Sequence, residues 1–187
     1  MENQRVRLSK MLLKNALIKL LKEKPVNKIT VKELCELSQI NRATFYTHYS
    51  DCFALLESIE NELIDAFEQS LRYVNSFDVT ALIEAIYDMI DRNQEACRAL
   101  IFGNTSSTIL KRMIALAKKG SIAYWRKELP ATEDAELEMM YTHLSNGLMH
   151  VVVEDYDRYS TEEIIRFVSR VAKNSLSLLK KPSDAFA

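Results

Sequence analysis

The scarcity of turn-forming residues constrains the fold of this chain more than any other feature. Only three glycines and three prolines occur among its 187 residues. Hairpin-rich β architectures place these residues at their turns, so the composition disfavours them and favours long helices. Apolar residues make up 48% of the chain, which is typical of a globular protein and enough for a real core. We therefore predict an all-α protein.

Hydrophobic periodicity divides the chain into nine expected helices. Apolar residues repeat at helical spacing through each of them, as Leu8, Met11, Ala16 and Leu20 do in the first. The expected helices cover residues 6–23, 30–37, 41–48, 51–73, 79–92, 94–102, 106–127, 135–153 and 161–179. Side chains that can cap a helix start stand at four of these beginnings: Thr30 with Glu33 as a capping box, Asn41, Ser50 or Asp51, and Thr161.

The charge is distributed unevenly along the chain. Residues 1–50 carry ten Lys and Arg against four Asp and Glu, a balance of +6, whereas residues 51–187 have a balance of −7. A basic head (residues 1–50) followed by an acidic body (residues 51–187) indicates that the head binds a polyanion. Variation of several charges between small domains is also common, and charge alone leaves that alternative open.

Two further observations bear on the cellular compartment. No run approaches eighteen apolar residues, and the start, MENQRVRLSK, lacks the apolar segment of a signal peptide. The three cysteines are scattered and form no CxxC pair, which is typical of reduced thiols. We therefore expect a cytoplasmic protein that neither spans a membrane nor is secreted.

The first three expected helices have the arrangement of a helix-turn-helix unit, in which the second short helix enters the major groove of DNA. Helical spacing turns Ile40, Phe45 and Tyr49 inward, onto Leu34 and the first helix. The residues left on the outer face of residues 41–48 are Arg42, Ala43, Thr44, Tyr46, Thr47 and His48.

These outward side chains have chemistry that suits DNA. Arg42 can read a guanine edge with two hydrogen bonds, and the methyl group of Thr44 or Thr47 can meet a thymine methyl. Tyr46 and His48 can donate to phosphates, which fixes register more than sequence. Packing between domains is the alternative use of such a surface.

The start of the preceding short helix also suits phosphate. Thr30 and Lys32 stand there, where backbone N–H groups and a cation favour an anion.

The segment ITVKELCELSQINRATFYTHYSDCFALLESI resembles the DNA-binding signature of the TetR family of bacterial transcriptional regulators. The resemblance covers roughly residues 8–65, and the helical remainder fits the family's architecture. It implies a helix-turn-helix DNA-binding domain in residues 1–50 and a helical effector-binding and dimerisation domain in residues 51–187. The DNA-facing residues that it implies are Thr30, Lys32, Arg42, Ala43, Thr44, Tyr46, Thr47 and His48.

Two positions depart from the family pattern. The family usually has Gly in the turn where this chain has Gln39, so a left-handed backbone there would be mildly strained. The family also tends to place Lys near the start of the fourth helix, where this chain has Cys52. The second departure removes one expected phosphate contact.

The last two expected helices carry apolar stripes that can pair with a second subunit, as they do in proteins of this family. Ser145 and Gly147 allow close helix approach, and two-fold symmetry in DNA sites favours a homodimer. The expected dimer-interface residues are Tyr141, Leu144, Ser145, Leu148, Val152, Val168, Val171 and Ser175. The alternative is that both stripes belong to the core of a monomer.

A ligand pocket is expected between the fourth and seventh helices. The candidate lining residues are Phe67, Tyr87, Met89, Phe102, Met113, Tyr124 and Trp125, each of which also suits an ordinary core. His143 and His150 lie seven residues apart, which is too far for one metal ion, so we expect no metal and no cofactor.

The sequence lacks a phosphate-cradling Gly loop, HExxH and a nucleophile elbow, so we do not expect an enzyme. The family resemblance implies a homodimeric repressor that binds a palindromic operator through residues 41–48. A small-molecule effector in the body would then release it. The alternative is a helix-turn-helix activator, or a regulator whose body responds to a protein partner.

Overall fold

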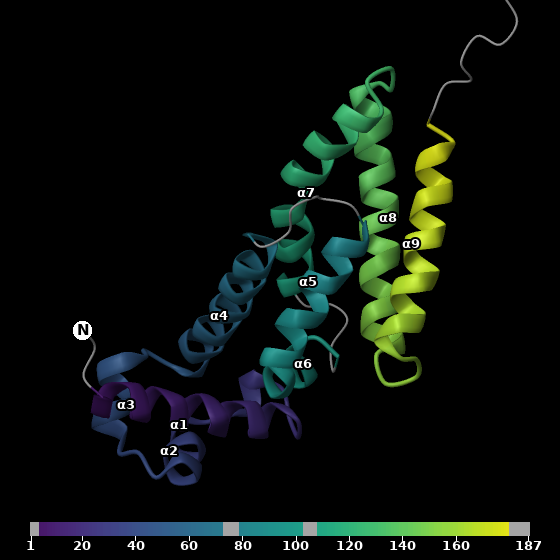
Figure 1. The fold of residues 1–187 in the computed structure, drawn as a ribbon. Helices are drawn as coiled ribbons and strands as arrows, with labels where there is room; N and C mark the ends of the chain where they lie inside the picture. The colour runs from purple at the N-terminus through teal and green to yellow at the C-terminus, as the bar shows by residue number, and fades with distance from the viewer. Residues whose placement is uncertain (1–3, 73–78, 103–107, 180–187) are drawn as a thin grey trace, which may run out of the picture. The chain divides into compact units, whose positions relative to one another are not determined.

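A computed structural model of the chain describes residues 4–72, 79–102 and 108–179. These residues are almost entirely helical, which confirms the predicted all-α class (Figure 1). The helices are α1 (Gln4–Leu21), η1 (Val26–Lys28), α2 (Val31–Ser38), α3 (Arg42–His48), α4 (Cys52–Arg72), α5 (Val79–Arg92), α6 (Gln94–Leu100), α7 (Thr108–Glu128), α8 (Asp134–Asp155) and α9 (Thr161–Ser177).

The chain forms two compact units. The first comprises Met1–Asp65 and Asn93–Ser106, and the second comprises Ala66–Arg92 and Ser107–Ala187. Residues 52–65 of α4 therefore belong to the first unit, and so does α6. The predicted boundary between residues 50 and 51 separates a DNA-binding domain from an effector-binding domain. It is a division by function, which these packing units do not test, so it stays a prediction.

The first unit is built around α1, which packs against α2, α3 and α6. Its core is made of fully buried side chains from these helices and α4, including Leu13, Leu34, Phe45 and Leu55. The predicted inner stripe of the first helix is wrong at its start, because Leu8 and Met11 are 52% and 50% exposed. The packed face is instead the one that carries residues 13, 16 and 17.

In the second unit α7 packs against α8, α5 against α9, and α8 beside α9 (Figure 1). Trp125, Leu129, Leu137 and Tyr141 form one buried cluster between α7 and α8. The Tyr141 hydroxyl donates to the carbonyl of Ile114 at 2.5 Å. Burial raises the pKa of that hydroxyl to about 12, so it stays protonated and keeps this bond at neutral pH.

Side-chain caps fix several helix starts. The predicted caps Asn41 and Asp51 are confirmed: each accepts a backbone N–H three residues on, at 2.7 and 2.8 Å. The prediction that Thr161 caps the last helix is wrong. Thr161 is already helical, and the preceding Ser160, in extended backbone conformation, forms a capping box with Glu163.

Candidate nucleic-acid interface

The helix α3 presents one buried face and one exposed face. Phe45 is fully buried and Tyr49, just beyond the helix end, is 8% exposed, as the sequence spacing predicted. Tyr46 is 58% exposed, and its ring touches Phe45 edge-on with ring centroids 5.4 Å apart. A seven-residue helix is too short to be stable alone, so the buried Phe45 holds this exposed face in place.

The predicted DNA-contacting residues of α3 fall into two groups. Arg42, Ala43, Tyr46 and Thr47 are exposed, whereas Thr44 and His48 are half-buried. The residues are therefore brought together on one surface of the first unit. The Thr47 hydroxyl donates to the Thr44 carbonyl at 2.6 Å, which leaves its methyl group and its oxygen lone pairs for a ligand.

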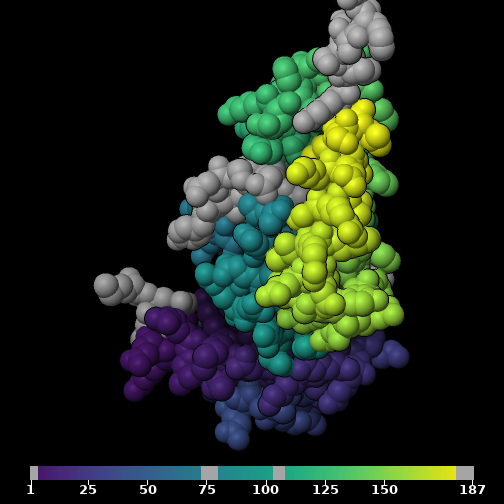
Figure 2. Space-filling view, turned by 45° about the vertical axis from the view of Figure 1, so that its right-hand side comes forward, coloured from purple at the N-terminus to yellow at the C-terminus, as the bar shows by residue number. Residues whose placement is uncertain are grey.

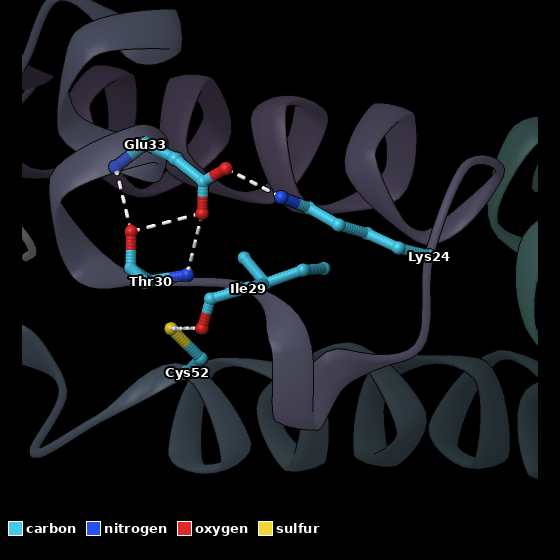
Figure 3. A network of polar contacts seen from close by, with 5 residues as sticks. All are labelled: Lys24, Ile29, Thr30, Glu33 and Cys52. Atoms are coloured by element: carbon cyan, nitrogen blue, oxygen red, sulfur yellow. Dashed lines mark hydrogen bonds and ion pairs between the residues drawn. The ribbon is translucent and has the colours of Figure 1, made fainter.

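The start of α2 is organised by a network of polar contacts (Figure 3). The predicted capping box is confirmed: the Thr30 hydroxyl accepts the Glu33 backbone N–H at 3.2 Å, and the Glu33 carboxylate accepts the Thr30 backbone N–H at 2.9 Å. The Lys24 ammonium donates to the other oxygen of that carboxylate. Sequence reasoning missed Lys24, because it stands nine residues before Glu33 and no local pattern predicts a contact between the two.

Lys32, the second predicted residue at the start of α2, is exposed. Its ammonium lies 3.9 Å from the Glu36 carboxylate, one helical turn away, and both side chains are about two-thirds exposed. An exposed pair at that distance holds its partners weakly. Lys32 therefore remains able to reach an external anion.

The Glu33 carboxyl has a lowered pKa. It lies at about 2 rather than 4.5, chiefly because Lys24 donates a hydrogen bond to it and next because the Thr30 backbone and hydroxyl do so. The unfolded carboxyl takes up a proton first, so this contribution to stability is present above pH 4.5 and is lost as the pH falls toward 2.

We expect the Glu33→Gln variant to lose less stability than the wild type over this interval, since glutamine keeps a hydrogen-bond acceptor but does not titrate. Urea unfolding midpoints measured from pH 5.5 to pH 2.5 test this expectation. Parallel curves for the two proteins would show that Glu33 does not carry the effect.

The turn between α2 and α3 has the predicted left-handed residue. Gln39 has φ 56° and ψ 30°, and it is the one non-glycine residue with positive φ in the described part of the chain. Its backbone N–H bonds the carbonyls of Cys35 and Glu36 and so closes α2.

We expect Gln39→Gly to stabilise the protein by about 0.5–1 kcal/mol. The relief of left-handed strain exceeds the entropy that glycine adds to the unfolded chain. The control is Gln39→Ala, which keeps a Cβ in the left-handed conformation and should bring no gain. Urea unfolding measures both, and a destabilised glycine variant would contradict the strain argument.

Cys52 occupies the position where a lysine was expected. Its side chain is buried, and its sulfur donates to the Ile29 carbonyl at 3.4 Å (Figure 3). Burial raises the pKa of the thiol, so it stays protonated. The group therefore ties α4 to the segment before α2 and has no surface available for a phosphate.

The predicted pocket residues do not gather around one cavity. A cavity of about 30 Å³ lies in the second unit, and Phe67 and Trp125 are the two candidates that line it. Three further candidates are buried in the core outside that lining: Tyr87, Met89 and Met113. The Tyr87 ring stacks on the Tyr156 ring, with the ring centroids 5.9 Å apart. Tyr124 packs against the Trp125 cluster, and Phe102 belongs to the first unit.

The predicted dimer-interface residues also fall into two groups, which differ in burial. Tyr141, Leu148, Val152 and Val168 are buried within the second unit and already pack in its core. Leu144, Ser145 and Ser175 are half-buried, and Val171 is 38% exposed.

No helix in the described part of the chain is long and apolar enough to cross a membrane. The described residues also contain no group of three His, Cys, Asp or Glu side chains that could hold a metal ion.

The chain resembles transcriptional regulators in sequence and in fold. No protein-family model matches it. A 58-residue segment is 31% identical to YxbF of Bacillus subtilis, which is described as an uncharacterized HTH-type transcriptional regulator. That segment is 31% of this chain but only 15% of the relative's length.

Two solved structures share the fold over almost the whole chain. A TetR transcriptional regulator from Streptococcus agalactiae is 19% identical with a TM-score of 0.64, covering 95% of this chain and 97% of that one. A protein from Pseudomonas aeruginosa, described as a transcriptional regulator, is 15% identical with a TM-score of 0.61, covering 94% and 97%. The predicted resemblance to the TetR family is therefore confirmed at the level of the fold. Both neighbours are described as transcriptional regulators.

Proposed function

We propose that the chain is a DNA-binding transcriptional regulator of the TetR type, which inserts α3 into the major groove of its operator. The observation that carries the proposal is the division of α3. Phe45 and Tyr49 anchor it in the first unit, while Arg42, Tyr46 and Thr47 project from it. This is the arrangement that a recognition helix needs, with one face fixed by the core and the other free to meet base edges.

Each exposed group has a distinct role in the proposal. Arg42 reads a guanine through two hydrogen bonds, and the methyl groups of Ala43 and Thr47 meet thymine methyls. Tyr46 and His48 contact phosphates and set the register of α3 in the groove. At the start of α2, Thr30 and Lys32 add further phosphate contacts. A bacterial regulator of this type meets its operator in the cytoplasm, so a cytoplasmic location is part of the proposal.

We also propose that the regulator acts as a homodimer through α8 and α9. The exposed side of α9 carries Phe167 and Val171, which are 50% and 38% exposed, and Leu178 at the C-terminal cap of this helix is 82% exposed. The three residues recur at helical spacing. Figure 2 shows α9 along the surface of the second unit. A two-fold pair sets two copies of α3 about 34–36 Å apart, in successive major grooves of a palindromic site.

On α8 the exposed surface includes Gly147. A Cβ built on Gly147 meets nothing within 4 Å in the chain itself, so no intrachain contact requires glycine there. A glycine inside a helix costs about 1 kcal/mol relative to alanine. Close approach of a partner helix is a reason to keep it.

We expect Gly147→Arg to fold normally and to weaken self-association at least tenfold, because a long charged side chain would stand in the proposed interface. Sedimentation velocity over a concentration series measures the change. The matched control is Ala123→Arg on the exposed side of α7, which should leave association unchanged. Equal dimer stability in the two variants would remove Gly147 from the interface.

In more detail, we propose that the protein represses transcription and that a small-molecule effector bound in residues 51–187 releases it from DNA. The cavity of about 30 Å³ is far smaller than the roughly 300–1,000 Å³ of small-molecule sites, so a ligand there would have to open the core. This size favours a second candidate, a regulator whose body responds to a protein partner. That partner would bind exposed apolar surface such as the α9 face.

Selection of bound duplexes from a random DNA pool, at two salt concentrations, tests the proposed function. We expect an enriched palindrome with half-sites near one helical turn apart, and an affinity that falls steeply as salt rises. A protein that is folded and dimeric but enriches no sequence would refute operator recognition. Purified Arg42→Ala protein is the control, because it keeps the fold but lacks the proposed guanine contact.

A further inference from the structure

The start of α2 places a carboxylate among the residues that we propose to contact phosphates. The Glu33 carboxylate accepts hydrogen bonds from both donors of Thr30, the backbone N–H at 2.9 Å and the hydroxyl at 2.9 Å. A phosphate that approaches Thr30 therefore meets this carboxylate as well. Because like charges repel, the carboxylate by itself opposes DNA binding at the start of α2.

The Glu33 carboxylate is charged at neutral pH. Its pKa is lowered to about 2, first because Lys24 donates a hydrogen bond to it and next because Thr30 does so. The Glu33 side chain is 38% exposed, so the charge lies close to solvent. The repulsion of a phosphate is therefore present under the conditions in which the protein would bind DNA.

Lys24 supplies the opposite charge at this point. Its ammonium donates to the second oxygen of the Glu33 carboxylate, whereas both bonds from Thr30 go to the first (Figure 3). The Lys24 side chain is 27% exposed, against about two-thirds for both partners of the exposed pair between Lys32 and Glu36. Salt screens a partly buried pair less than an exposed one, so Lys24 compensates Glu33 over a wide range of salt.

The backbone fixes where Lys24 starts. Its N–H bonds the Leu20 carbonyl in the last turn of α1 at 3.0 Å, and Pro25 follows directly with φ −67°. The Lys24 ammonium therefore reaches Glu33 from the end of α1, nine residues before it in the chain. The positive charge comes from outside α2 and compensates the carboxylate that caps this helix.

We propose that Lys24 is a positioning residue for DNA binding, which neutralises Glu33 so that this carboxylate can cap α2 without repelling the phosphate at Lys32. The inference rests on the proposed DNA-binding function. Two other roles of Lys24 lead to different results. In the first, Lys24 contacts a phosphate itself. In the second, its bond to Glu33 is a mechanical tie between α1 and α2, whose charge has no effect on DNA.

Four variants of the full chain separate these roles, with gel-shift titration on the operator that the wild type selects. Lys24→Gln should weaken binding about fivefold at low salt and less as salt rises, because salt screens the uncovered carboxylate. Lys24→Arg keeps the charge and should bind within about twofold of the wild type. Glu33→Gln keeps the cap without the charge and should bind at least as tightly as the wild type.

The fourth variant, Lys24→Gln/Glu33→Gln, carries the decisive comparison. It lacks both charges, so its affinity should return to within about twofold of the wild type. Both this variant and Lys24→Gln lack the ion pair, so a loss of stability affects them alike and does not explain a difference between them. Circular dichroism melting at pH 7 compares their stability.

Three results would overturn the inference. A double variant as weak as Lys24→Gln, with Glu33→Gln unchanged, would show that Lys24 contacts phosphate itself. Weaker binding in both single variants and in the double variant would show a mechanical tie. Unchanged binding in Lys24→Gln would show that the charge of Glu33 does not reach the DNA. A wild type that selects no operator would instead refute the proposed function, so the two failures are distinguishable.

Discussion

Replacing Phe45 by alanine is expected to lower the free energy of unfolding of the first unit by about 3–5 kcal/mol. Phe45 is completely buried, and removal of a buried phenylalanine loses its transfer free energy and leaves a cavity. The loss falls on α3, whose seven residues cannot hold a helix without this anchor. Local amide hydrogen exchange in α3 and urea unfolding of the whole chain measure the effect.

The neighbouring position is the control for this prediction. Tyr46 follows Phe45 directly but is 58% exposed, so Tyr46→Ala should change stability by less than about 1 kcal/mol. A loss of less than about 1 kcal/mol in Phe45→Ala as well would show that the buried face of α3 does not hold this helix in place. DNA binding should be lost in the Phe45 variant, because an unfolded α3 has no surface to present.

The sequence predicted the helix-turn-helix part of the first unit well because its signals are local. The capping box at Thr30 and the cap at Asn41 are interactions over three residues, and the four-residue spacing of Phe45 and Tyr49 fixes which face of α3 is buried. The strained turn at Gln39 followed from a departure at a single position. Such features need no knowledge of distant residues.

The predictions for the second unit were less complete because they depend on packing between distant helices. Apolar stripes on α8 and α9 indicate burial but do not say which partner buries them. Tyr141 and Val152 turned out to pack inside the chain, whereas Phe167 and Leu178 stay exposed. The seven aromatic and methionine residues predicted to line a pocket mostly fill the core. Cavity size is a property of the packed structure, and composition does not reveal it.

The sequence did not predict the cleft of about 430 Å³ that residues of α1, α4 and α6 line in the first unit, for a related reason. Helical spacing counted Met11 in the apolar repeat of the first helix, which is expected to face the core. In the structure Met11 is half-exposed and lies with Lys10 and Lys14 along the same cleft. A helical period gives relative positions around a helix, and only the neighbouring helices decide which sector they cover.

Tyr46→Ala is expected to weaken operator binding by about 1–3 kcal/mol, roughly 5- to 150-fold, with no change in dimerisation. Its exposed ring rests edge-on against Phe45, which positions the hydroxyl at the outer surface of α3. Gel-shift titration on the selected operator measures the loss. Unchanged affinity would mean that α3 does not lie in the groove as proposed.

Two further substitutions separate the possible origins of that loss. Tyr46→Phe keeps the ring contact with Phe45 but lacks the hydroxyl, so a phosphate hydrogen bond predicts nearly the full loss in this variant as well. Because tyrosine is uncharged, the salt dependence of binding should stay as in the wild type. Lys32→Ala should instead lower the salt slope by about one. A reduced salt slope in the Tyr46 variants would show that they displace cationic contacts too, and the register of α3 would then depend on Tyr46 itself.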